Sequence, residues 1–516
     1  MKLALLKISA LCAALFVPSQ AAEKPNILFI AIDDMKPDLG CYGVDMVKTP
    51  NMDKLAARGA LFLNSHCNQA VCGPSRASLM TGLRPDRTKV HDLKTITREV
   101  TPWVTTLPQH FKNHGYITAG TGKIYDPRSV DKKSDELSWS QPFKLHSGLP
   151  YNKDYPEPVL GSYQSEAAHK AYEEITASGK SGYGPVSKAF FKRGLKVTVE
   201  STDVPDDAYA DGAYAKMGAK FIRDLSKKDE PFFVAVGFKK PHLPFIAPKK
   251  YWDLYQRDSM PLAKFKQAPE GAPPYALHNS NELRSYDGVP ADGPLSEAQQ
   301  RELIHGYYAC ISYIDAQVGL LMETLEKEGQ LENTIVILWG DHGWHLGDHG
   351  IWCKHTNYEQ STRSPLIIAG PGIESGVKTQ APTEFVDIFP SLCELSHIPN
   401  LENLDGISFV PVVSKKAEKV RESAVSQFGR GQRMGYGLRN ERFRYVLWVN
   451  NSEKKPPLSS LEGKIAAEEL YDYETDPLET KNLATDPAHA ETLKKLRAEA
   501  SSFLTAQAER IAREPK

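Results

Sequence analysis

Residues 25–35 read PNILFIAIDDM, an apolar run from Ile27 to Ile32 that ends in two aspartates. An apolar run without alternation is typical of a strand buried on both faces, as in a parallel sheet covered by helices. In open α/β sheets, ligands bind outside the carboxyl ends of the strands, which is where Asp33 and Asp34 would stand. This stretch therefore predicts an α/β fold with a ligand site at one edge of its sheet.

Similar apolar segments recur along the chain and alternate with helical ones. The pattern predicts strands within 60–63, 115–123, 231–238, 334–340 and 365–370, and helices within 50–58, 208–225 and 303–325. In the last helix, Tyr307, Ile311, Ile314 and Val318 recur at helical spacing, which indicates a face packed against the core. The alternation of strands and helices favours an α/β body.

The C-terminal part of the chain has a different pattern. From about Glu422 it shows short strands at 434–440 and 443–449, followed by a charged helix from about 488 to 512. Such a pattern is typical of a small antiparallel sheet with one helix packed on it. We therefore expect a main domain over 23–415 and a C-terminal subdomain over 416–516.

The N-terminus has the form of an export signal. Lys2 precedes an apolar run from Leu3 to Val17, and Ser19-Gln20-Ala21 suits cleavage after Ala21 or Ala22. Residues 1–22 are therefore predicted to be a signal peptide, and the mature protein to be exported, either periplasmic or secreted. No later stretch has the roughly 20 apolar residues needed to cross a bilayer, so no membrane span is expected.

Charge and cysteine content exclude some classes of protein. The 516 residues include 63 Lys and Arg against 64 Asp and Glu, so no basic surface recommends nucleic acid as a partner. Any recognition of anions must be local. Beyond Cys12, six cysteines remain, but their spacings form no disulfide framework and contain no CxxC motif.

The stretch VCGPSRASLMTG, residues 71–82, places Cys72 just before a predicted helix over 75–80. One interpretation is a small apolar residue on a buried turn. The other is an anion site, because the amides and dipole of a helix N-terminus favour an anion and Arg76 could add a bidentate donor.

Other strand ends carry polar side chains of the same kind. Asp33 and Asp34 could cap a turn, but two adjacent carboxylates after a buried strand repel each other unless a cation joins them. Candidate partners at other strand ends are Lys123, Asp341 and His342, and His242 and Lys354 stand on loops that follow strands. His242 stands between two prolines, which predicts extended backbone and a ring presented by a rigid loop, although a purely structural histidine is an alternative.

The motifs together resemble a known family. CGPSR matches the C-x-P-S-R signature of type I, formylglycine-dependent sulfatases of the alkaline phosphatase superfamily, and the surrounding segments are similar to the iduronate-2-sulfatase-like branch. These segments span nearly the whole mature chain: NILFIAIDDMKPDLGCYG, TPNMDKLAARGALFLNSHCNQAVCGPSRASLMTGLRPD, KPHLPF, GDHGWHLGDHGIWCKHTNYE and LYDYETDPLETKNLA. The resemblance implies a large, mixed, mainly parallel sheet sandwiched by helices, with a smaller C-terminal α+β subdomain.

The resemblance also implies a nucleophile and a metal. Cys72 would be converted to Cα-formylglycine by a formylglycine-generating enzyme, and the hydrated aldehyde would attack sulfur. One Ca²⁺ would be held by the modified Cys72 together with Asp33, Asp34, Asp341 and His342. Because calcium prefers oxygen ligands, His342 is the weakest member of this set.

Four further residues acquire roles by resemblance. Arg76 and Lys123 would stabilise the formylglycine and the sulfate, while His242 and Lys354 would contact the ester. The leaving alcohol would take its proton from His242. The substrate would be a sulfated oligosaccharide or polysaccharide, such as one bearing the 2-O-sulfate of a uronic acid, chosen by loops such as 129–201 and the Arg-rich segment 429–444.

One residue departs from the branch pattern GK-x-x-H, since Asp126 stands where the histidine is usual. A carboxylate there would repel sulfate unless it turns away or another group such as His91 takes over. Two alternatives therefore stay open. The chain could be a phosphatase or phosphodiesterase of the same superfamily, with two zinc ions, or a catalytically impaired binder of sulfated glycans.

Overall fold

The computed structural model describes residues 24–450 and 461–515, so the predicted signal peptide lies outside the described residues. Its main sheet has seven strands in the order β12-β2-β11-β8-β1-β6-β4. Their bounds are β1 (Asn26–Ile32), β2 (Ala60–Phe62), β4 (Ile117–Gly122), β6 (Phe232–Phe238), β8 (Thr334–Gly340), β11 (Leu366–Ala369) and β12 (Val377–Thr379). Strand β11 runs antiparallel to β2 and β8, whereas the other pairs are parallel. The predicted mixed, mainly parallel sheet is confirmed.

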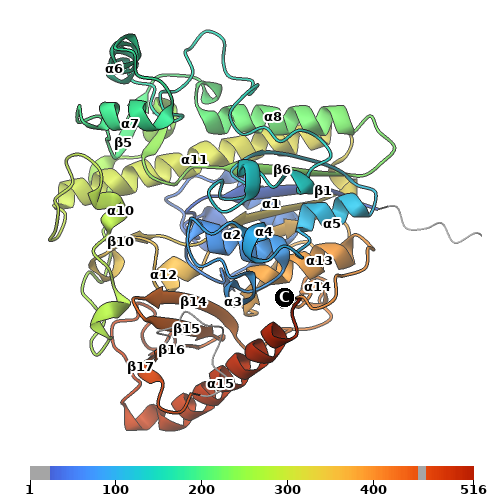
Figure 1. Cartoon of the computed structure of the whole chain (residues 1–516), viewed down its shortest axis with the longest axis vertical. Coiled ribbons are helices and arrows are strands. Elements are labelled where there is room, and N and C mark those ends of the chain that lie inside the picture. The colour runs from blue at the N-terminus through green and yellow to red at the C-terminus, as the bar shows by residue number, and fades with distance from the viewer. Residues whose placement is uncertain (1–23, 451–460, 516) are drawn as a thin grey trace, which may run out of the picture.

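Helices cover both faces of this sheet, as Figure 1 shows. Alternate residues of β1 point to opposite faces, so Leu28 and Ile30 join one core while Ile27 and Phe29 join the other. The first core includes residues of α1 (Pro50–Arg58), α8 (Ala210–Leu225) and α11 (Glu297–Lys327). The second includes residues of α2 (Cys72–Thr81), α5 (Leu107–Asn113) and α13 (Ile388–Leu395). Burial on both faces explains why the strands read as unbroken apolar runs.

The predicted helix signals hold, but two helices start earlier than expected: α2 begins at Cys72 rather than at residue 75, and α11 begins before Leu303. Helix α1 begins with Pro50 and ends before Gly59, as expected. Helix α11 starts six residues before the predicted Leu303, because Ser296 and Gln299 form a capping box that extends it. Its apolar spacing begins only where the helix reaches the core, which is why the sequence pattern placed its start too late.

The C-terminal part forms the expected antiparallel sheet and helix. Strands β14 (Ala424–Arg430), β15 (Arg433–Arg439), β16 (Phe443–Asn450) and β17 (Ile465–Asp472) pair in that order. Helix α15 (Ala490–Ala512) closes their core, to which Leu496 and Leu504 contribute. Figure 1 shows this unit below the main sheet. The predicted smaller α+β subdomain is confirmed, while its boundary at 416 stays a prediction.

The remaining elements lie around the main sheet. Short strands pair two by two: β3 (Ser65–His66) with β13 (Thr383–Glu384), β5 (Val199–Thr202) with β7 (Phe245–Pro248), and β9 (His345–Leu346) with β10 (Trp352–Cys353). Helices α6 (Glu166–Ala177) and α7 (Tyr183–Phe191) belong to the loop region predicted to choose the substrate. Within the described ranges, all six cysteines are unpaired and no helix combines the length and apolarity that a bilayer crossing requires.

Candidate active site

Four neighbouring strands deliver the candidate residues to one edge of the main sheet. Strands β4, β6, β1 and β8 are adjacent and parallel, so their carboxyl ends meet. Asp33 and Asp34 follow β1, Lys123 follows β4, and Asp341 follows β8 directly. His242 lies in the loop after β6, where its N–H donates to Lys239 O over 2.9 Å. The predicted loop is thus present, but this turn replaces the extended backbone that we expected around His242.

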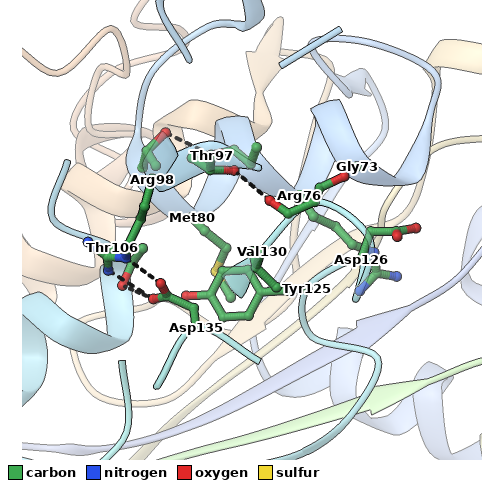
Figure 2. Close-up of a pocket in the computed structure, with 13 residues that line it drawn as sticks. Gly73, Arg76, Met80, Thr97, Arg98, Thr106, Tyr125, Asp126, Val130 and Asp135 are labelled. Carbon is green, nitrogen blue, oxygen red and sulfur yellow. Dashed lines mark hydrogen bonds and ion pairs between the residues drawn. The ribbon is translucent and has the colours of Figure 1, made fainter. Parts of the chain in front are cut away.

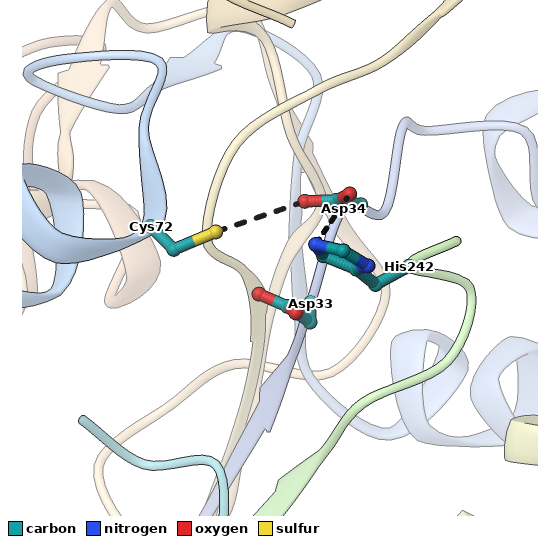
Figure 3. Close-up of side chains that lie close together, drawn as sticks. All are labelled: Asp33, Asp34, Cys72 and His242. Carbon is teal, nitrogen blue, oxygen red and sulfur yellow. Dashed lines mark hydrogen bonds and ion pairs between the residues drawn. The ribbon is translucent and has the colours of Figure 1, made fainter. Parts of the chain in front are cut away.

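Cys72 occupies the first position of α2 and points into this cluster, as Figure 3 shows. Its Sγ lies 3.3 Å from His342 Nε2 and 3.9 Å from Asp34 Oδ1. Burial, reinforced by the charge of Asp33, raises the pKa of the Cys72 thiol well above its usual value. An unmodified Cys72 would therefore stay protonated at neutral pH and be a poor nucleophile.

The Arg76 guanidinium binds carboxylates of the cluster. Its Nε donates to Asp341 Oδ2 over 2.9 Å and its Nη2 to Asp33 Oδ1 over 3.1 Å. Its Nη1 donates to the carbonyl oxygens of Lys123 and Ile124. The contact of Arg76 with a bound anion stays a prediction. Its fully buried side chain orients two carboxylates.

Two lysines compensate the remaining negative charge. Lys123 Nζ lies 2.5 Å from Asp33 Oδ2. Lys354 Nζ lies 2.9 Å from Asp34 Oδ2 and 2.9 Å from Glu282 Oε1. Although burial opposes ionisation, Lys123 and Arg76 hold the pKa of Asp33 well below its usual value.

His242 faces the same carboxylates from the other side. Its Nε2 lies 3.2 Å from Glu282 Oε1 and 3.7 Å from Asp34 Oδ2, and its Nδ1 lies 2.6 Å from Leu243 O. Burial and the neighbouring charge of Lys354 lower the pKa of His242 to about 4. The imidazole is therefore neutral at neutral pH while no anion is bound.

The cluster has the composition of a cation site. Two groups of residues could hold an ion: Asp33, Asp34, Cys72 and His242, and Cys72, Asp341 and His342. His342 Nδ1 lies 3.0 Å from Gly343 O, so Nδ1 carries a proton, and His342 Nε2 lies 3.2 Å from Asp34 Oδ1. Burial raises the pKa of Asp34 to about 7, although the charge of Lys354 opposes the shift.

Asp126 is buried, but its charge is compensated. Its two carboxylate oxygens accept from Arg128 Nε over 2.9 Å and from Arg128 Nη2 over 2.7 Å. Against the effect of burial, the Arg128 hydrogen bonds and the Lys123 charge lower the pKa of Asp126. Asp126 lines a pocket beside α2 together with Gly73 and Arg76 (Figure 2). The carboxylate is thus paired with Arg128 rather than free to repel an anion.

The structure does not bring His91 into the cluster. Its ring nitrogens lie 3.6 Å from Asp86 Oδ1 and 3.4 Å from Gln69 Oε1. Glu282, at the start of α10 (Asn281–Arg284), is a member of the site that sequence reasoning missed. It lies in a polar segment without periodicity or a recognisable motif, so no sequence signal marked it.

Comparison with known proteins agrees with this architecture. The family model "Sulfatase" matches residues 25–398, and the model "N-sulphoglucosamine sulphohydrolase, C-terminal" matches residues 347–505. Iduronate 2-sulfatase of Mus musculus is 30% identical, covering 95% of this chain and 97% of its own, and that of Homo sapiens is 31% identical, covering 93% and 95%. A sulfatase of Formosa agariphila is 28% identical over 90% of this chain and 84% of its own.

Solved structures share the fold at low identity. A protein in complex with its substrate D-glucosamine-2-N,6-O-disulfate has a TM-score of 0.68 and 21% identity, covering 95% of this chain and 98% of its own. The phosphonate monoester hydrolase of Agrobacterium radiobacter has a TM-score of 0.67 and 24% identity, covering 94% and 96%. From the family models and the full-length relatives, we conclude that the chain belongs to the sulfatase family and is a sulfuric ester hydrolase with an alkaline phosphatase-like fold.

Proposed function

We propose that the chain hydrolyses an O-sulfate on a sulfated saccharide, with the 2-O-sulfate of a uronic acid as the first candidate. The observation that carries the proposal is the position of Cys72, whose Sγ faces Asp34 and His342 at the carboxyl edge of the sheet. Two relatives of about 30% identity that carry the name iduronate 2-sulfatase support the choice of substrate.

The nucleophile is assigned to a Cα-formylglycine made from Cys72. One hydroxyl of the hydrated aldehyde attacks sulfur, the bond from sulfur to the ester oxygen breaks, and the second hydroxyl then loses its proton and expels sulfate as the aldehyde returns. The raised pKa of the unmodified thiol supports this assignment, because a protonated thiol would attack poorly. A serine or cysteine could not release sulfate in this way.

The cation is assigned to Asp33, Asp34, Asp341, His342 and residue 72. A bound Ca²⁺ would polarise the sulfate and lower the pKa of the nucleophilic hydroxyl. The carboxylate oxygens favour a hard cation of this type, and His342 Nε2 lies beside Asp34 Oδ1 and Cys72 Sγ in the same cluster. Arg76 would hold two of these carboxylates in place, and Lys123 would stabilise the charge beside them.

The ester is assigned to His242 and Lys354. Lys354 Nζ already contacts Asp34 and would add positive charge next to the sulfate. Burial and, after it, the Lys354 charge keep the pKa of His242 low; an anionic ester beside the ring would offset the charge of Lys354 and so favour protonation of the imidazole. That proton would then go to the leaving alcohol oxygen.

The alternatives are less well supported by the same geometry. A two-zinc phosphatase needs a second set of metal ligands, whereas Lys123 and Lys354 bring ammonium groups to the flanks of the carboxylates. An impaired glycan binder was suggested by Asp126, and that carboxylate is paired with Arg128.

The proposal extends to partners, location and domains. A formylglycine-generating enzyme would have to act on Cys72 before the chain folds, since the side chain is buried. Export through the segment 1–22 would place the protein in the periplasm or outside the cell. The catalytic domain would cover 23–415 and the C-terminal subdomain 416–516.

Turnover assays test the function directly. The wild type should hydrolyse 4-nitrocatechol sulfate and leave 4-nitrophenyl phosphate nearly untouched, and Cys72→Ala should abolish turnover. Faster hydrolysis of the phosphate would instead favour the phosphatase. A carboxyl-bearing saccharide with a single 2-O-sulfate then tests the choice of substrate, with its 6-O-sulfated isomer as the control.

A further inference from the structure

Arg430, at the end of β14, lies against the backbone that carries Lys354. Its Nη2 donates to the carbonyl oxygen of His355, the residue after Lys354. The guanidinium carbon lies 4.6 Å from the centroid of the Phe428 ring. His278 Nε2 lies 2.5 Å from Lys354 O, so the C-terminal subdomain and the active-site loop share one cluster here. Arg430 is thereby held against the backbone of the residue that follows Lys354.

The charge of Arg430 has no carboxylate partner among the described residues, and its Nε is buried without a hydrogen-bond acceptor. Burial lowers the pKa of Arg430 to about 10. Other buried arginines of the same sheet are paired: Arg439 and Arg444 donate to Glu359 over 3.1 and 2.5 Å. An unpaired, partly desolvated cation destabilises a fold, and binding of an anion relieves that cost.

Neighbouring groups do not supply the missing negative charge. Glu282, the carboxylate beside Lys354, is engaged by that lysine and by His242. Arg433, which pairs with Arg430 across the hairpin, is exposed and stacks over Tyr275 at 4.5 Å, so it adds positive charge to the same end of the hairpin. The environment of Arg430 thus has a surplus of positive charge beside the backbone of the loop that carries Lys354.

We propose that Arg430 binds a second anionic group of the saccharide, a carboxylate or a further sulfate, while the first sulfate occupies the site at Cys72. Nη1 has no hydrogen-bond acceptor among the described residues, and a guanidinium N–H donates strongly to the oxygens of carboxylates and sulfates. The proposal rests on the proposed function, because it assumes that the substrate is a sulfated saccharide. It makes Arg430 a specificity residue that selects doubly charged substrates.

The test compares Arg430→Ala and Arg430→Lys with the wild type. The matched control is Arg442→Ala, an exposed arginine of the same sheet that pairs with Asp472 and Glu474. Three disaccharides serve as probes: one with a 2-O-sulfated uronate and a sulfate on the neighbouring sugar, its carboxyl-reduced form, and its form without the neighbouring sulfate. Binding is measured by calorimetry, and kcat and KM are measured alongside.

Arg430→Ala should weaken binding of the full disaccharide and raise its KM by about 10- to 100-fold, the range for a hydrogen bond to a charged group. This loss of affinity should disappear on one of the two simpler probes. If it disappears on the carboxyl-reduced probe, Arg430 binds the carboxylate; if it disappears on the probe without the neighbouring sulfate, Arg430 binds that sulfate. Arg430→Lys should retain part of the affinity. Arg442→Ala should bind the probes as the wild type does, and turnover of 4-nitrocatechol sulfate should be unchanged in the variants. If Arg430→Ala binds all three probes as the wild type does, or loses affinity equally for all three, the proposal is overturned. A wild type that binds the probes but hydrolyses no sulfate ester would refute the proposed function alone.

Discussion

Replacing Arg76 by methionine probes the charge balance of the site. The Arg76 side chain is 1% exposed and pairs with Asp341 at 2.9 Å and Asp33 at 3.1 Å, both of which are equally buried. Methionine keeps apolar volume beside Trp339, whose ring centroid lies 5.5 Å from the guanidinium, but leaves two carboxylates without their shared cation. Removing one partner of a buried ion pair costs about 3–5 kcal/mol, so Arg76→Met should lower the free energy of unfolding by about that amount.

The assay is equilibrium unfolding in urea, followed by tryptophan fluorescence in buffer that contains a chelator. The control is Arg58→Met, since Arg58 pairs with Glu332 on the surface, where the two side chains are 42% and 85% exposed. A pair of this kind contributes only about 0–1 kcal/mol. A loss below about 1 kcal/mol for Arg76→Met, equal to that of the control, would refute the assignment of Arg76 as the cation that holds the carboxylates.

The loss of unfolding free energy in Arg76→Met should also depend on pH, and the pKa of Asp33 determines in which direction. The pKa of Asp33 is held below its usual value, so its ion pairs stabilise the fold above the unfolded-state pKa of about 3.9. That stability is lost as the pH falls through the lower, folded-state pKa. The difference between wild type and Arg76→Met should therefore narrow below about pH 4. A difference that grows on acidification would contradict this.

Three further perturbations test other parts of the site. Arg128→Met leaves the buried Asp126 without its main partner, so kcat/KM for 4-nitrocatechol sulfate should fall about tenfold, and adding Asp126→Asn should restore part of it. If kcat/KM does not recover in the double variant, the role of Arg128 is not to neutralise Asp126. Glu282→Gln removes the carboxylate that orients His242 and should lower kcat about 10- to 100-fold, as loss of a supporting residue does, while Tm stays near that of the wild type. Chelation should abolish turnover and lower Tm because the buried aspartates then repel one another, and Ca²⁺ should restore both, whereas full activity in chelator would exclude a required cation.

The fold could largely be predicted because burial dictates composition. Strands covered on both faces must be apolar throughout, so β1, β6 and β8 were visible as unbroken runs. The direction of β11 could not be derived from its residues, since an apolar run reads the same in a parallel or an antiparallel strand.

The sequence predicts those residues of the candidate site that directly follow a strand of the main sheet. The two aspartates after β1, Lys123 after β4 and Asp341 after β8 share an edge because their strands are parallel and adjacent. The partners of Arg76 and the pairing of Asp126 with Arg128 depend on side-chain directions that no spacing encodes. Glu282 comes from a polar loop whose place is set by tertiary packing alone.

The most direct test of the central claim is mass spectrometry of the peptide that contains Cys72, taken from protein purified from its native host and shown to hydrolyse 4-nitrocatechol sulfate. The account predicts that residue 72 has the mass of formylglycine or its hydrate, and that the modified fraction scales with specific activity across preparations. An active preparation in which residue 72 is wholly unmodified cysteine would contradict it.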